Sequence, residues 1–131
     1  MIVLDASAAI ELLLNTHGGR RVATRLSDLA ESLHSPHLLS VEVAQVLRRY
    51  VASGAVSAEI ASAALDDLAD LDIARYGHEP FLPRVWELRA NVTAYDAVYL
   101  ALAEALDAPL LTFDRRLAAA PGHGAVVEVL Q

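Results

Sequence analysis

The feature that most constrains the fold is a short apolar run, Ile2-Val3-Leu4, that leads directly into Asp5. An apolar run of this length that stops at a polar residue is typical of a buried strand. Burying a lone carboxylate is costly unless it is paired, hydrogen-bonded or bound to a metal. The sequence therefore predicts that the strand delivers Asp5 to a place where other polar groups meet it.

Strand and helix patterns alternate along the rest of the chain. Strands are predicted at 2–4, 72–75, 110–112 and 126–130, and the turn-like segment 34–37 either follows or contains a further short strand. Helices are predicted at 6–14, 20–33, 40–53, 81–90, 94–106 and 114–120, with one more starting after a Ser57 cap. This alternation predicts an α/β sandwich around a mainly parallel sheet. Ligands of such sheets gather beyond the carboxyl ends of the strands.

Several side chains are expected in the core of these helices. Helix 20–33 is expected to bury Val22, Leu26, Leu29 and Leu33. The helix after Ser57 is expected to bury Ile60, Ala64, Leu65 and Leu68, and Trp86 is available for packing from helix 81–90. The helices on either side of Gly54 are expected to form a hairpin that projects from the core.

Composition narrows the class of protein. The 131 residues suit a single domain over 1–131, and 55% hydrophobic with 21% charged residues argues against disorder. The chain shows neither a membrane-length apolar run nor a signal-peptide pattern, so we expect a soluble, cytoplasmic protein with no membrane partner. The absence of cysteine excludes disulfides and thiolate sites. The apolar excess favours a partner-binding surface slightly over a merely alanine-rich composition.

The charge pattern is uneven. The net charge of −7 argues against tight, sequence-independent binding of nucleic acid. All ten basic residues are arginine, however, and three pairs occur, at 20–21, 48–49 and 115–116. Solvated helix faces explain the first two pairs adequately. Arg115 and Arg116 follow a candidate site acid and are candidate phosphate contacts.

Four acids stand at predicted strand ends or helix starts: Asp5, Glu42, Asp96 and Asp114. Each has a structural alternative, because acids also cap helices and favour the first helical turn, where Ser40 and Thr93 are possible caps for Glu42 and Asp96. Taken together, the four would converge at one sheet edge and repel one another without cations. Such an oxygen-rich cluster suits Mg²⁺ or Mn²⁺.

Two hydroxyls lie two residues from a site acid, Ser7 after Asp5 and Thr112 before Asp114. They are candidates to orient a carboxylate or a metal-bound water, with capping and strand propensity as the alternatives. The histidine spacing does not match a zinc site. Receiver domains and haloacid-dehalogenase-like phosphatases also place an aspartate after the first strand, but both need a lysine, and this chain has none.

The candidate residues lie in four stretches of the sequence: 2–7 (IVLDAS), 38–49 (LLSVEVAQVLRR), 93–103 (TAYDAVYLALA) and 111–117 (LTFDRRL). Together, and in this order, the four stretches resemble the PIN-domain ribonucleases, and specifically the VapC toxins of toxin–antitoxin pairs. Departures are small. Gln45 stands where many relatives have Asn, and Asp107 replaces a common Gly before a strand.

The resemblance implies a three-layer α/β/α sandwich with strand order 3-2-1-4-5. It also implies that Asp5, Glu42, Asp96 and Asp114 bind Mg²⁺ (or Mn²⁺) and cleave RNA through a metal-activated water, leaving 5′-phosphate and 3′-hydroxyl ends. Arg115 and Arg116 would contact the RNA. The implied partners are a VapB-like antitoxin and a second copy in a homodimer, for which the helix hairpin around Gly54 is the expected interface. A non-catalytic, partner-binding PIN-like domain is the alternative.

Overall fold

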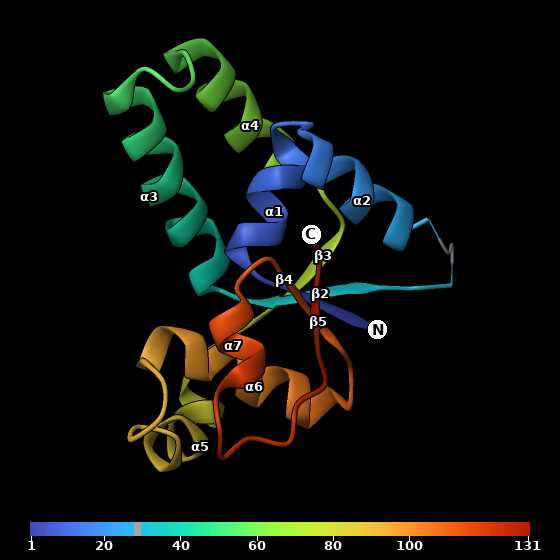
Figure 1. The fold of residues 1–131 in the computed structure, drawn as a ribbon, viewed down its shortest axis with the longest axis vertical. Coiled ribbons are helices and arrows are strands. Elements are labelled where there is room, and N and C mark those ends of the chain that lie inside the picture. Colours follow the sequence, from blue (N-terminus) through green and yellow to red (C-terminus); the bar gives the residue numbers. More distant parts are fainter. Residues whose placement is uncertain (28–29) are drawn as a thin grey trace.

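The computed structural model describes residues 1–27 and 30–131 (Figure 1). Within these residues, five strands form one sheet in the order β3-β2-β1-β4-β5, and every neighbouring pair is parallel. The strands are β1 (Ile2–Leu4), β2 (Leu33–Pro36), β3 (Ile73–Tyr76), β4 (Leu110–Thr112) and β5 (Val127–Val129). The predicted strand order is confirmed, and segment 34–37 does contain the second strand.

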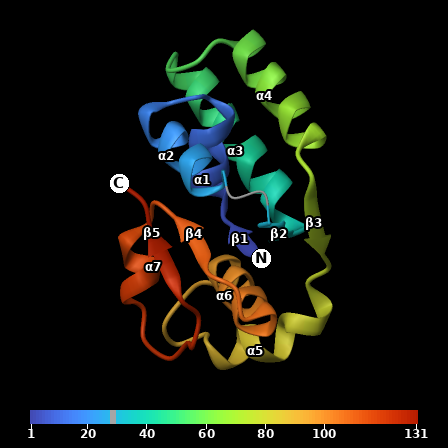
Figure 2. The same cartoon turned by 90° about the vertical axis from the view of Figure 1, so that its right-hand side faces the viewer.

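Helices cover both faces of the sheet, which confirms the three-layer sandwich (Figures 1 and 2). One layer holds α1 (Ala6–Leu13), α2 (His17–Arg25), α3 (Leu38–Ser53) and α4 (Ala58–Asp70). The other holds α5 (Leu82–Glu87), α6 (Ala94–Leu106) and α7 (Arg115–Ala119), with a 3₁₀ turn at Glu79–Phe81 before α5. Among the described residues, no helix is both long and apolar enough to cross a membrane.

The central strands are apolar on both sides because they are covered on both sides. Side chains of a strand alternate between its faces. Ile2 and Leu4 therefore join the core under α1 and α3, whereas Val3 joins the core under α6. Leu111 and Leu110 divide in the same way on β4. The register pairs Val3 with Leu110, so the ends of β1 and β4 reach the same edge of the sheet.

Helices α3 and α4 form the predicted hairpin, which projects from the sheet (Figure 1). Gly54 ends α3 in the left-handed conformation (φ 79°), and the Ser57 hydroxyl accepts the Ile60 N–H at 3.1 Å to begin α4. The predicted buried face of α4 is partly wrong. Ala61, Ala64 and Leu68 are buried against the core, whereas Ile60 (53% exposed) and Leu65 (39% exposed) are not. A hairpin that projects from the sheet has core neighbours on only one side of α4.

The predicted helix 20–33 is wrong at both ends. Helix α2 begins at His17, where the Thr16 hydroxyl accepts the Gly19 N–H at 2.9 Å, and it ends at Arg25. Val22 is buried as predicted, but Leu33 belongs to β2, and the predicted core residue Leu29 lies outside the described residues. Glycine at 18 and 19 reads as a helix breaker. Here Gly19 instead lets α2 approach α1, because a Cβ there would lie 1.9 Å from the Glu11 carbonyl oxygen.

Helix α5 is shorter than the predicted 81–90, and Trp86 is not a core residue. Val85 and Leu88 face the core and leave Trp86 on the outer side, 67% exposed, with the Arg89 guanidinium 4.7 Å from its ring centroid. Helix α6 has the bounds that the sequence predicts, and it ends at Asp107 in the left-handed conformation (φ 49°). Asp accepts this conformation better than most residues because its short side chain bonds locally.

Candidate active site

Asp5 lies directly after β1, where it caps α1. Its carboxylate is 8% exposed. One oxygen accepts the Ser7 hydroxyl at 2.7 Å and the Ala8 N–H at 3.0 Å, and the other accepts the Thr112 hydroxyl. Continuing the register of β1 and β4 places Asp5 opposite Thr112, which explains why these two side chains meet. The expected costly burial of Asp5 is thus offset by three donors.

The same two hydroxyls also fix the chain after β4. The Ser7 oxygen accepts the Phe113 N–H at 2.9 Å, and the Thr112 oxygen accepts the Asp114 N–H at 3.0 Å. Each hydroxyl thus donates to Asp5 and accepts a backbone N–H from the segment that carries Asp114. The structure places Ser7 and Thr112 where they orient Asp5 and tie it to the second acidic segment.

Glu42 reaches the same edge from α3. The predicted Ser40 cap is wrong, because α3 begins at Leu38 and Ser40 lies inside it, where it accepts a bond from Arg75. Glu42 is therefore beyond the first turn, and a capping role does not explain it. Instead, the start of α3 is fixed by His78, whose Nε2 accepts the Leu38 N–H at 3.0 Å.

Tyr99 is a site residue that the sequence reasoning missed. Its hydroxyl donates to Glu42 Oε1 at 2.7 Å, and its side chain is only 3% exposed. Burial and the nearby carboxylates raise the pKa of Tyr99, so the phenol keeps its proton and stays a donor. A signal was present in the sequence, since Tyr99 lies three residues after Asp96 and therefore on the same face of α6.

Asp96 and Asp114 complete the group of acids. Asp96 lies in the first turn of α6, whose Thr93 cap accepts the Asp96 N–H at 3.2 Å as predicted. Asp114 caps α7 by accepting the Arg116 N–H at 2.9 Å, and the Arg116 guanidinium contacts its carboxylate at 3.3 Å. Arg116 is thus already a charge partner of a site acid, whereas Arg115 is exposed beside it.

Burial and the charges of neighbouring carboxylates raise the pKa values of three of the four acids. Burial raises the pKa of Asp5 against the effect of its three hydrogen bonds, and the charge of Asp96 raises it further. Burial also raises the pKa of Glu42, the Tyr99 hydrogen bond lowers it, and the charges of Asp96 and Asp5 raise it. The pKa of Asp96 is raised by burial and then by the charge of Asp114. The four predicted acids therefore share one electrostatic field at the carboxyl edge of the sheet.

The donor set fits a hard divalent cation. Among the described residues, no three His, Asp or Glu side chains stand close enough together to form a ready-made metal cage. Mg²⁺ does not need one, because it usually keeps several waters and takes one or two carboxylates together with substrate phosphates. Carboxylates whose pKa values are raised by burial and by neighbouring negative charges favour a cation close to them. The arrangement suits a hydrated ion rather than a closed structural site.

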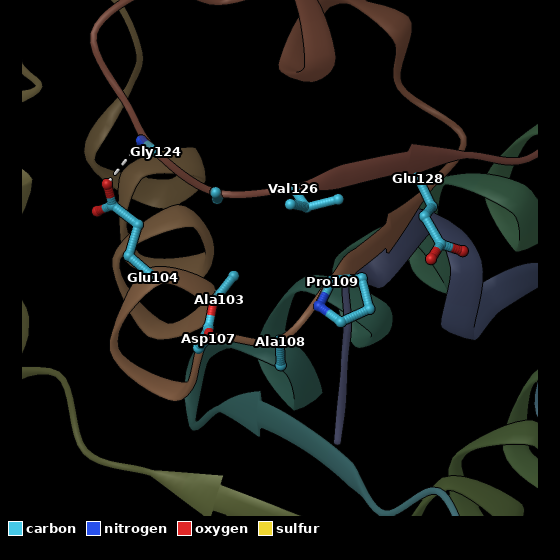
Figure 3. Close-up of a pocket in the computed structure, with 9 residues that line it drawn as sticks. Ala103, Glu104, Asp107, Ala108, Pro109, Gly124, Val126 and Glu128 are labelled. Atoms are coloured by element: carbon cyan, nitrogen blue, oxygen red, sulfur yellow. Dashed lines mark hydrogen bonds between the residues drawn. The ribbon is translucent and has the colours of Figure 1, made fainter.

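A second acidic region lies at the opposite edge of the sheet. A pocket of about 390 Å³ lies next to the residues that precede β4 and β5. Figure 3 shows Glu104, Asp107 and Glu128 around it. Glu104 is held by the Arg84 guanidinium at 2.9 Å and by the Gly124 N–H at 2.8 Å, and Glu128 is held by Arg25. Because arginine already neutralises two of these acids, this pocket does not share the chemistry of the first site.

Comparisons with known proteins agree with this geometry. The PIN domain family model matches residues 2–122. Ribonuclease VapC1 of Mycobacterium tuberculosis is 51% identical over 122 residues, which are 92% of this chain and 90% of that protein. Ribonuclease VapC12 of the same organism is 41% identical over 130 residues, which are 99% of each chain.

A solved structure shares the fold at much lower identity. VapBC2 from Rickettsia felis, bound to a DNA fragment from its promoter, superposes with a TM-score of 0.73 over 100% of both chains at 13% identity. The family model matches most of the chain, two relatives are 51% and 41% identical over nearly its whole length, and the solved structure shares its fold. The chain therefore belongs to the PIN-domain family, among its VapC members.

Proposed function

We propose that this protein is a divalent-cation-dependent endoribonuclease and the toxin of a toxin–antitoxin pair. The observation that carries the proposal is the convergence of Asp5, Glu42, Asp96 and Asp114 at the carboxyl edge of the sheet, where burial and then neighbouring carboxylates raise the pKa values of the first three. Perturbed acids of this kind mark functional sites more often than structural ones. The relatives VapC1 and VapC12, which carry the name ribonuclease, support RNA as the substrate.

Asp5, Glu42, Asp96 and Asp114 would hold Mg²⁺, or Mn²⁺ in its place. When bound, such an ion supplies a water of lowered pKa and a positive charge for the phosphate. Ser7 and Thr112 keep Asp5 in one orientation, and Tyr99 does the same for Glu42. Arg116 keeps positive charge beside Asp114, where the RNA backbone would arrive.

A second surface, away from the acids, supports the binding of an antitoxin. An apolar groove of about 520 Å³ lies between α3 and α4, lined by Leu47, Val51, Ala61 and Leu65 among others. Because α3 also carries Glu42, a segment that lies in this groove and continues along α3 reaches the acids. We propose that an antitoxin binds in this groove and covers the acids. A homodimer is proposed as well, without assigning its interface.

The test is cleavage of total cellular RNA by the purified protein, with mapping of the new ends. Mg²⁺ should support cleavage and a chelator should stop it. Asp5→Asn and Asp96→Asn should abolish cleavage while both variants still unfold cooperatively. Asp66→Asn, which changes an exposed acid on α4, is the matched control and should cleave like the parent.

Two results would overturn the proposal. Equal cleavage by the Asp5→Asn variant and the parent would show that the acids are not catalytic. A parent protein that captures an antitoxin but cuts no RNA with Mg²⁺ or Mn²⁺ would instead support the non-catalytic, partner-binding alternative.

A further inference from the structure

Positive charge is concentrated in one helix of an acidic protein. The chain has 17 acidic residues, yet none occurs between Glu11 and Asp28. Within that interval lie Arg20, Arg21 and Arg25, three of the ten arginines. All three belong to α2.

These arginines line a groove. A hollow of about 390 Å³ on α2 is bounded by His17, Arg20, Arg21, Thr24 and Arg25. Arg25 is tied to Glu128 by two hydrogen bonds of 2.8 and 3.0 Å. Arg20 and Arg21 are exposed, and among the described residues no carboxylate pairs with either of them. Their charge is therefore available to an anion, unlike that of Arg84, which two glutamates hold.

The start of α2 lies close to the segment that carries Asp114. The Phe113 ring, one residue before Asp114, lies against the start of α2, since a Cβ added at Gly18 would be 3.0 Å from its Cζ. Both α2 and α7 also contact β5, through the Arg25–Glu128 pair and through direct packing. Figures 1 and 2 show α2 and α7 in opposite layers, on either side of the carboxyl end of β5. The segment that carries Asp114 thus contacts the helix that carries Arg20 and Arg21.

We propose that the α2 groove is a second RNA-binding surface, which binds backbone phosphates several nucleotides away from the bond that is cut. The inference rests on the proposed ribonuclease function. Guanidinium groups bind phosphate through paired hydrogen bonds. Single-stranded RNA presents one phosphate per nucleotide, so a flexible strand leaving the acidic site can follow a line of arginines.

The Arg48–Arg49 pair offers a matched control. It is exposed on α3, but Arg48 bonds to Gln45 at 3.1 Å and lines the apolar groove between α3 and α4. It has the same charge and residue types without the connection through Phe113. Replacing both arginines of a pair by glutamine removes the same charge on either helix.

The first experiment measures RNA binding as a function of salt. In an Asp96→Asn background, which prevents cleavage, an unstructured RNA of about 16 nucleotides is titrated with the protein. Arg20→Gln/Arg21→Gln should weaken binding about tenfold and reduce the slope of log K against log salt by about 0.7 for each phosphate that the variant no longer binds. Arg48→Gln/Arg49→Gln should change neither, and both double variants should melt with the parent. Equal weakening of RNA binding by the two double variants would overturn the proposal.

The second experiment measures cleavage in the otherwise unchanged protein. With a long RNA that contains a mapped cleavage site, Arg20→Gln/Arg21→Gln should raise KM and leave kcat unchanged. With an RNA trimmed to about four nucleotides around that site, both constants should match the parent, because the short RNA does not reach α2. A similar rise in KM with both lengths would overturn the proposal.

The two experiments separate failure of the groove from failure of the proposed function. A protein that cuts no RNA but shows the predicted fall in salt dependence retains an RNA-binding groove and is not a ribonuclease. The double variant Arg20→Gln/Arg21→Gln could instead lose affinity for the antitoxin while its RNA binding and KM stay at the parent values. This result would mean that the groove binds an acidic segment of the protein partner, and it would reject the proposal.

Discussion

At the scale of single residues, the structure separates side chains that hold the acids from the acids themselves. Ser7 and Thr112 donate to Asp5, and Tyr99 donates to Glu42. Hydroxyls that hydrogen-bond to a metal-binding carboxylate fix its orientation, and removing them typically costs 10-fold to 100-fold in metal affinity or activity. The spacing of Ser7 predicted its bond to Asp5, whereas Thr112 was paired with Asp114 in the sequence and the fold brings its hydroxyl to Asp5 instead. The role of Tyr99 depends on how α3 lies against α6, and the sequence alone does not predict that contact.

Tyr99→Phe is expected to lower the rate of RNA cleavage by about 10-fold or more. The ring still fills the core, so the melting temperature should change little, but Glu42 loses the donor that orients it. The concentration of Mg²⁺ needed for half-maximal cleavage should rise. Tyr76→Phe is the control, because it removes a hydroxyl that bonds to His34 at the same 2.7 Å but away from the acids. Parallel effects of the two variants would argue against the positioning role.

Asp96→Asn is expected to raise the melting temperature of the metal-free protein at neutral pH. The pKa of Asp96 is raised in the folded state, so the folded protein binds this proton more tightly than the unfolded chain does. The stability that this bound proton contributes is fully present below the pKa that Asp96 has in the unfolded chain. It is lost as the pH rises through the pKa that Asp96 has in the folded protein. The gain on substitution should therefore appear at neutral pH and shrink in acid, below the unfolded pKa.

Thermal melts across this pH range, with chelator present, check the prediction. The exposed control Asp66→Asn should track the parent throughout. A variant that melts below the parent at neutral pH would mean that the Asp96 carboxylate stabilises the fold, as a capping role requires.

At the scale of helices and strands, the largest difference between prediction and structure concerns α2. Two adjacent glycines predict an interruption because glycine disfavours the helix by about 1 kcal/mol relative to alanine. The preference is overridden by the close approach of α1, which leaves no room for a Cβ at Gly19. The sequence also left strand β2 ambiguous, because tertiary contacts again override the local pattern. Its residues, His34-Ser35-Pro36, are polar and turn-like, but the buried Ser35 hydroxyl and the buried His34 ring each find hydrogen-bond partners in the fold.

Gly19→Ala is expected to destabilise the protein by about 3 kcal/mol or more, measured by urea unfolding. Helix propensity alone predicts a gain, so the sign of the result decides between propensity and packing. Gly77→Ala is the control, because a Cβ there would meet only the Glu79 carboxylate at an ordinary 3.6 Å. A neutral or stabilising Gly19→Ala would mean that α1 and α2 do not pack as closely as the structure has them.

At the scale of the whole molecule, the alternating strand and helix patterns predicted an α/β sandwich around a mainly parallel sheet, and the resemblance to the PIN-domain ribonucleases supplied the strand order and the three layers. The apolar strands β1 and β4 are buried on both faces, and each ends at a candidate acid or hydroxyl. Packing at the surface was harder to predict. Ile60, Leu65 and Trp86 are apolar and were predicted to pack, yet they are exposed because the helices that carry them have core neighbours on only one side.

Adding Mg²⁺ is expected to raise the melting temperature of the parent protein by several degrees. A ligand that binds only the folded state stabilises it by about 2.7 kcal/mol when its concentration is 100 times Kd. Each kcal/mol corresponds to a few degrees for a domain of this size. The shift should disappear in Asp5→Asn, since this variant removes the most buried of the four carboxylates. An equal shift in parent and variant would place the ion elsewhere.

The position of β1 at the centre of the sheet has a consequence for synthesis. Its neighbours are β2 and β4, and the hydroxyl of Thr112 that holds Asp5 comes from 107 residues further along the chain. A nascent chain that has not yet reached β4 therefore carries Asp5, Glu42 and Asp96 but lacks the strand that fixes the first of them. The acidic edge is completed only after β4 and Asp114 have been made, so a nascent chain that ends before them does not yet hold a finished site.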